Sequence, residues 1–137
     1  MYALLSGPSY KGRDWDRYRA LFIEDAHVSV TVDGPGMPVD VGVLSADDYI
    51  ARVAPDIQRG VYEKEVSREV EQSGRMAHVF SKFESRHAAT DEKPFERGVN
   101  SVQLLNDGTR WWIVSVYSSV DASGNPPASR GPTPPRP

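Results

Sequence analysis

Hydrophobic and polar residues alternate along several stretches of the chain with the two-residue period of a β-strand. The alternation predicts a β-hairpin in which residues 26–32 and 37–43 flank the turn Asp33-Gly34-Pro35-Gly36. Three further strands show the same pattern, with a polar loop after the first of them: residues 76–85, loop 87–96, residues 99–105 and residues 110–118. Asn106-Asp107-Gly108-Thr109 is a strong hairpin signal and joins the last two strands.

Apolar residues three and four positions apart predict two helices. Asp14 is expected to cap the first, residues 15–22, whose apolar stripe is Trp15, Tyr18, Leu21 and Phe22. Ser45 and Asp48 resemble a capping box that opens the second helix, with these residues facing inward: Tyr49, Ile50, Val53 and Ile57. Pro55 lies inside that pattern and predicts a kink or a break, with Gly60 closing the element. Ser6-Gly7-Pro8 is a turn signal, so residues 2–5 are expected to be the last turn of a helix.

Residues 62–72, YEKEVSREVEQ, are compatible with either type of element. Tyr62, Val66 and Val70 are four positions apart, which places them on one face of a helix or of a strand. The Glu, Lys and Arg residues favour a helix, because several oppositely charged pairs would form four residues apart. The pattern alone leaves both possibilities open.

The last predicted strand is apolar on both faces. Trp111, Ile113 and Tyr117 point to one side, and the residues Trp112, Val114 and Val116 point to the other. Both faces of such a strand must be covered. Helices can cover one face, and we expect a second copy of the chain to cover the other in a homodimer.

Composition narrows the possible classes of protein. The 137 residues contain 19 acidic and 16 basic side chains, a net charge of −3, and no clustered basic face, so nucleic-acid binding is not expected. No apolar stretch is long enough to span a membrane, so no membrane partner is expected, and the absence of cysteine is compatible with the cytoplasm. Residues 121–137 hold six of the eleven prolines and predict a disordered tail after a single domain of residues 1–120.

Four side chains are candidates for acid–base chemistry. His78 and Glu84 share a strand face and could form a base with its orienting group, although a hydrogen-bonded interface histidine is the more ordinary arrangement. Glu63 and Glu65 share a face and could divide acid and base roles, or belong to a solvated charge ladder. Asp14 is expected to act mainly as a cap. The spacing of the three histidines predicts no metal site, and no cofactor is expected.

Five strings, in this order and spacing, resemble the SnoaL-like branch of the nuclear transport factor 2-like superfamily: RDWDRYRALFIEDAHV, LSADDYI, AHVFSKFESR, RGVNSVQL and DGTRWWIVSV. The resemblance implies an α+β fold in which a curved antiparallel sheet wraps around helices as a cone with an apolar pocket, commonly as a homodimer. It also implies that residues 62–71 form a long strand, against their local propensity.

Two departures from the family matter. Its members normally begin with a longer helix, of which only residues 1–5 remain here. Steroid-isomerase-like members carry a catalytic aspartate at the position of Val30, and a second one near Asn100 or Ser101, neither of which is acidic. A proton-abstracting site needs a carboxylate, so the resemblance does not extend to isomerase chemistry.

In the family's usual strand orientation, Trp112, Val114 and Val116 would line the pocket, with Ser101 and Gln103 as polar groups across the hairpin. In the reversed orientation Trp111, Ile113 and Tyr117 would line it instead. Trp15 and Tyr18 of the first helix could wall the same pocket.

The leading hypothesis is a domain that binds a small apolar or aromatic molecule. The alternatives are a cyclase, hydratase or dehydratase acting on a polyketide, steroid-like or aromatic substrate, or a structural protomer whose tail binds a partner.

Overall fold

The computed structural model describes residues 1–33 and 42–121. Within these residues it contains three helices and five strands: α1 (Tyr2–Leu5), α2 (Trp15–Arg19), β1 (Phe22–Asp33), α3 (Ala46–Ile57), β2 (Tyr62–Ser73), β3 (Met76–Arg86), β4 (Glu96–Asn106) and β5 (Trp111–Asp121). The predicted tail beyond Asp121 and most of the predicted strand 37–43 lie outside the described residues. No helix in the described ranges has the length and apolar character that a membrane crossing needs.

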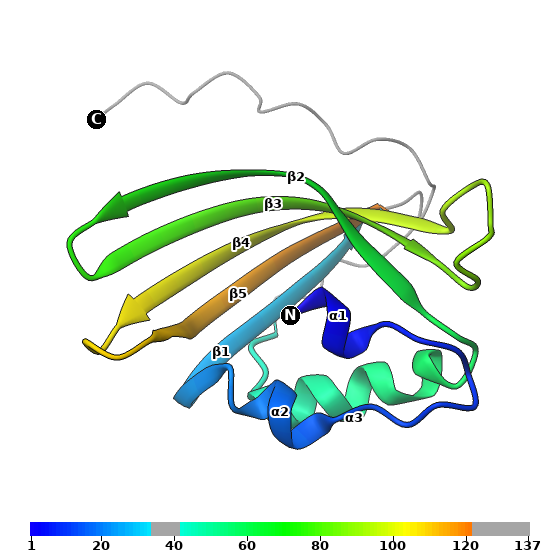
Figure 1. Ribbon diagram of the computed structural model, residues 1–137, viewed down its shortest axis with the longest axis horizontal. Helices are drawn as coiled ribbons and strands as arrows, with labels where there is room; N and C mark the ends of the chain where they lie inside the picture. The colour runs from blue at the N-terminus through cyan, green and yellow to red at the C-terminus, as the bar shows by residue number, and fades with distance from the viewer. Residues whose placement is uncertain (34–41, 122–137) are drawn as a thin grey trace.

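The five strands form one curved sheet in the order β1-β5-β4-β3-β2, and Figure 1 shows all three helices on its inner side. The predicted α+β fold with a curved sheet around helices is confirmed. The sheet is antiparallel from β2 to β5, but β1 pairs with β5 in parallel, so it is mixed and not wholly antiparallel. Beside β1, an antiparallel bridge joins Val28 to Leu44, and the connecting part of the predicted hairpin, residues 34–41, lies outside the described residues.

The ambiguous segment is a strand. β2 pairs with β3 along its whole length, and Gly74, with φ of 55°, makes the tight turn between them. Its charged side chains are largely exposed on this edge strand, where they cost little and discourage pairing with other chains. Pairing with β3 therefore outweighs the local preference for helix.

Both predicted helices form, with different ends. The Asp14 side chain accepts a hydrogen bond from the Arg17 N–H at 3.0 Å, but α2 ends at Arg19 rather than residue 22. It ends early because the Leu21 carbonyl accepts a hydrogen bond from the Ile113 N–H at 2.8 Å, which draws the chain into the sheet.

Helix α3 has the predicted capping box between Ser45 and Asp48. It continues through Pro55 to Ile57, so the expected break does not occur. A proline in the last turn removes only one helical hydrogen bond, and the buried side chains of Ile50 and Ile57 hold the helix against the core.

A β-bulge in β5 decides which side chains face the helices. Gln103 of β4 pairs with Ser115 while Leu104 pairs with Ile113, so Val114 is an extra residue. Ile113 and Val116 therefore both belong to the core on the inner face. Neither expected orientation of β5 holds along its whole length, because the bulge exchanges the faces half-way.

Candidate functional site

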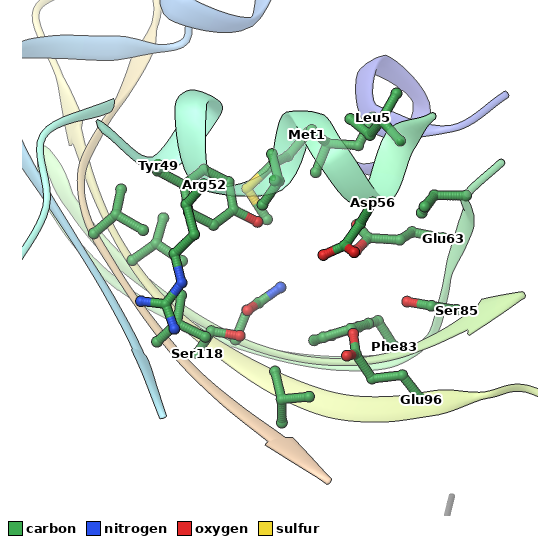
Figure 2. A pocket seen from close by; sticks show the side chains of 18 of the residues that line it. Met1, Leu5, Tyr49, Arg52, Asp56, Glu63, Phe83, Ser85, Glu96 and Ser118 are labelled. Atoms are coloured by element: carbon green, nitrogen blue, oxygen red, sulfur yellow. The ribbon is translucent and has the colours of Figure 1, made fainter. Parts of the chain in front are cut away.

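A cavity of about 370 Å³ lies between the inner face of the sheet and the helices. Most of its wall is apolar and comes mainly from α1, α3, β1, β3 and β5, with the residues Leu5, Val28, Val53, Ile57, Phe83 and Val116 among its members. Figure 2 shows that the polar side chains gather at two ends. Arg52 and Ser118 lie at one end, and Asp56, Glu63, Ser85 and Glu96 lie at the other.

The acidic end is built by a row of side chains across three strands. Glu63 of β2 pairs with Ser85 of β3, and Ser85 pairs with Glu96 of β4. Directly opposed residues of antiparallel strands have Cβ atoms roughly 4.5–5.5 Å apart. The row lies on the inner face and points into the cavity, where Asp56 of α3 approaches it (Figure 2).

Burial changes the proton affinity of both glutamates. Burial raises the pKa of Glu63 to about 7, and the negative charge of Glu96 acts in the same direction, whereas the Ser85 hydroxyl and the Met1 amino group oppose the shift. Burial, followed by the charge of Asp56, also raises the pKa of Glu96. The Glu63 side chain is half-buried, because the part of it that lines the cavity remains accessible to solvent. Near neutral pH, Glu63 can therefore either hold or release a proton.

Ser85 occupies the centre of the row. The residue is 1% exposed, and its Oγ is the sole buried side-chain polar atom in the described part of the chain without a hydrogen bond of ordinary length. Such a group is rare in a folded protein, because burying an unpaired hydroxyl costs about 1–3 kcal/mol. The hydroxyl can therefore form a hydrogen bond of ordinary length with a group that enters the cavity.

Two tyrosines form the wall near the helices. Tyr18 of α2 is 2% exposed and stacks on Tyr49 of α3 with ring centroids 6.4 Å apart. Burial raises the pKa of both hydroxyls, so both stay protonated at neutral pH. Each can donate a hydrogen bond, and neither is a base.

The two positions that depart from the steroid-isomerase pattern both line the cavity. Val30 contributes only apolar surface. Asn100 is buried, and its Nδ2 donates a hydrogen bond to Tyr2 Oη at 3.0 Å. Tyr2 Oη is also 2.7 Å from Ser81 Oγ, so Asn100 is part of a network that anchors α1 to the sheet.

Of the four catalytic candidates, only Glu63 lines the cavity. Asp14 caps α2 on the surface. His78 and Glu84 lie on the opposite side of the sheet, here called the rear face, which also carries Phe80, Ser101 and Tyr117. His78 Nε2 is 2.9 Å from Ser101 Oγ, and Glu84 forms ion pairs with Arg86 at 2.8 Å and Arg97 at 2.9 Å. Hydrogen bonds from these arginines lower the pKa of Glu84, which keeps it charged.

The ligand-binding candidates are also divided. Tyr18 lines the cavity, while Trp15 packs on Tyr18 with ring centroids 6.1 Å apart. Ser101 lines a shallow groove on the rear face, and Gln103 and Trp112 share that face. Val114 is the bulged residue. Trp112 Nε1 donates to Asp107 Oδ2 at 2.6 Å, and Arg110 lies 3.2 Å above its ring, so Trp112 stabilises the β4–β5 turn.

Sequence reasoning missed Ser85 and Glu96. The sequence pattern predicts a polar loop at Glu96 and the end of a strand at Ser85, so neither residue stands out as part of a site. The available signal was the register of two hairpins: once β2 pairs with β3 and β3 with β4, Glu63, Ser85 and Glu96 become neighbours. Among the described residues, no group of three histidine or acidic side chains is placed to hold a metal ion.

No family model matches the sequence, and no curated protein matches it significantly. Solved structures do match its fold. A protein of unknown function from Nostoc punctiforme with a cystatin-like fold has a TM-score of 0.63 at 13% identity, over 80% of this chain and 78% of that one. A nuclear transport factor 2-like protein with a cystatin-like fold, from Novosphingobium aromaticivorans, has a TM-score of 0.60 at 13% identity, over 77% of this chain and 68% of that one.

The chain has the nuclear transport factor 2-like fold. A nuclear transport factor 2-like protein of unknown function from Pseudomonas putida agrees, with a TM-score of 0.59 at 13% identity over 77% of this chain and 72% of that one. The predicted resemblance is thus confirmed for the fold. At this identity the likeness does not reach function, and the SnoaL-like branch stays a prediction.

Proposed function

We propose that this nuclear transport factor 2-like domain binds a small, largely apolar molecule in its cavity. The cavity of about 370 Å³ carries the proposal, since its volume falls in the range of small-molecule sites, roughly 300–1,000 Å³. Its composition supports the same conclusion. An apolar wall supplies affinity, and the polar groups at the two ends supply orientation.

A bulky side chain placed inside the cavity tests the proposal. Ser118 lines the cavity on β5, so Ser118→Phe is expected to weaken binding of the neutral fluorescent probe N-phenyl-1-naphthylamine by about tenfold or more, since the added ring occupies the probe's volume. Probe fluorescence during titration measures the change.

Ser119→Phe is the matched control, because Ser119 lies next along β5 and faces the rear groove. Ser119→Phe should change the affinity for the probe by less than about twofold. If Ser119→Phe weakened binding while Ser118→Phe did not, the probe would sit in the rear groove and the cavity proposal would be wrong. Circular dichroism checks that both variants fold.

We also propose that two copies of the chain pair through the rear face. Three large apolar side chains on this face are exposed, namely Met76 at 61%, Leu105 at 43% and Tyr117 at 50%. Phe80 and Val99 line the shallow groove beside Tyr117. A second copy would remove this surface from water, as the hydrophobic effect favours.

Sedimentation velocity at micromolar concentration tests the pairing. We expect a dimer, and we expect Tyr117→Arg to convert it to a monomer, because a charge at the centre of the contact would be buried without a partner. Val70→Arg is the control, since Val70 is similarly exposed, at 55%, but lies near the end of the edge strand β2. A wild-type monomer at these concentrations would contradict the proposal.

One observation favours the enzyme alternative. Glu63 lies in the cavity with a pKa raised to about 7, the range in which a carboxyl group works best as a general acid or base at neutral pH. His78, Glu84 and Asp14 lie outside the cavity, so a reaction there would depend on Glu63 and Glu96. Turnover of a bound compound that Glu63→Gln abolishes would establish this alternative.

A further inference from the structure

The acidic end of the cavity has an excess of negative groups. Asp56, Glu63 and Glu96 all line it. Arg59 lies 3.9 Å from Asp56, and both of these side chains are mostly exposed, at 76% and 68%. Solvent therefore weakens the attraction between Arg59 and Asp56. Arg59 compensates little of the negative charge on the two glutamates, which lie deeper in the cavity. The Met1 amino group acts on Glu63 but not detectably on Glu96.

A second, independent observation points to a missing ligand group at the same place. Ser85 Oγ is buried, points into the cavity between the two glutamates, and forms no hydrogen bond of ordinary length within the described residues (Figure 2). A bound group with several N–H donors could bond to this oxygen and to both carboxylates at once. A positively charged group would also cancel their mutual repulsion.

We propose that the acidic end of the cavity binds the protonated amine of a small molecule whose apolar or aromatic body fills the rest of the cavity. This inference rests on the proposed function. The ammonium group would lie over the Glu63–Ser85–Glu96 row, with Phe83 on the adjoining wall. Tyr18 and Tyr49 would contact the body.

The geometry favours an ammonium group over the other candidates. A metal ion needs ligands that converge on one point, and no three acidic or histidine side chains of the described chain do so. A neutral hydroxyl could bond to Ser85, but it would leave the charges of Glu63 and Glu96 uncompensated. Two or three N–H donors match the row of acceptors and supply the missing charge.

The amine affinity should depend on pH. Glu63, whose pKa is raised to about 7, gains a proton and loses its charge as the pH falls, so the affinity should fall with it. The groups that face this end come from every surrounding element: Asp56 of α3, Arg59 after α3, Glu65 of β2, His87 after β3, Glu96 of β4, Tyr18, Tyr49 and the Met1 amino group.

Two ligands of the same shape test the inference. 2-(2-Naphthyl)ethylamine carries a positive charge throughout the working range, and 2-(2-naphthyl)ethanol is its neutral counterpart. Calorimetric titration of the full chain at about pH 8 should show the amine binding about tenfold tighter than the alcohol. At about pH 5.5 the preference should shrink to less than about threefold.

Isosteric variants identify the groups responsible. Glu63→Gln and Glu96→Gln should each reduce the preference for the amine by about fivefold or more and leave binding of the alcohol nearly unchanged. Glu71→Gln is the control, because it removes the same charge from an exposed position on β2. If the pH dependence survived unchanged in Glu63→Gln, the assignment to Glu63 would be overturned.

The two proposals can fail separately. Equal affinity for amine and alcohol at about pH 8, with both bound in the cavity, would overturn the amine inference and leave the binding function intact. If neither compound nor N-phenyl-1-naphthylamine bound, the proposed function itself would be wrong. Because Ser118 borders both the cavity and the rear groove, sensitivity of the bound compounds to Ser118→Phe together with insensitivity to Ser119→Phe shows that they occupy the cavity.

Discussion

Replacing Tyr18 by alanine is expected to lower the free energy of unfolding by about 4 kcal/mol, since large-to-small changes at buried aromatic residues cost about 3–5 kcal/mol. The residue is 2% exposed and its ring contacts three others, at centroid distances of 6.1 Å to Trp15, 5.4 Å to Phe22 and 6.4 Å to Tyr49. These contacts join α2, β1 and α3. Their loss should loosen the whole helical side of the cavity.

Urea denaturation followed by circular dichroism measures the effect. Tyr18→Phe keeps the ring and should recover most of the lost stability, which separates packing from the role of the hydroxyl. Tyr10→Ala is the control at a tyrosine that is 90% exposed, and its effect should stay within about 0.5 kcal/mol. A loss below about 1 kcal/mol in Tyr18→Ala would show that these contacts do not hold the helices on the sheet.

Gly98→Ala is expected to cost about 3 kcal/mol and to lower the melting temperature by roughly 10 °C. A Cβ at Gly98 would lie 2.6 Å from Phe83 Cζ and 2.8 Å from the Ser119 carbonyl oxygen. The ring could turn away, but the carbonyl belongs to the backbone of β5. The absence of a side chain at Gly98 is therefore what lets Phe83 lie across β4.

The same substitution should affect the cavity. Phe83 lines its wall, so a displaced ring would enter the cavity and weaken probe binding in the molecules that still fold. Thermal unfolding measures the stability, and the probe titration measures the cavity. Gly12→Ala is the control, since a Cβ there would meet nothing within 4 Å. Equal melting temperatures for Gly98→Ala and Gly12→Ala would contradict the packing described here.

The parts of the fold that the sequence predicted well depend on local chemistry. The turn Asn106-Asp107-Gly108-Thr109 joins β4 and β5 as expected, and Ser45 caps α3 through Asp48. Such signals involve neighbouring residues only. The strand at residues 62–73 is different: its local composition favoured a helix, and only the resemblance to a known fold predicted it correctly.

The faces of β5 could not be predicted from its sequence. Residues 111–116 are apolar at five of six positions, so no alternation of apolar and polar residues marks the place of the bulge. One extra residue at Val114 is enough to reverse which residues of β5 face the helices. Trp112 therefore lies on the rear face, whereas Val116 lines the cavity. The error follows from the uniformity of the strand.

The acidic row was missed for a related reason. Glu63, Ser85 and Glu96 are far apart in the sequence, and only the register of two hairpins makes them neighbours. Glu63 was recognised as a candidate because it lies on a strand. Glu96 looked like one more charge in a polar loop, since a carboxyl group in a cavity and one in solvent have the same sequence signature.

The strand order has a consequence for synthesis of the chain. β1 is made early, but its neighbour in the sheet is β5, which ends at Asp121. Strands β2 to β5 can pair one after another as they leave the ribosome. The apolar side of β1, in contrast, stays exposed to solvent until β5 has been translated, which is nearly the end of the domain. This first strand is therefore where a nascent chain most needs protection from aggregation, and the wall of the cavity is complete only once β5 has joined β1.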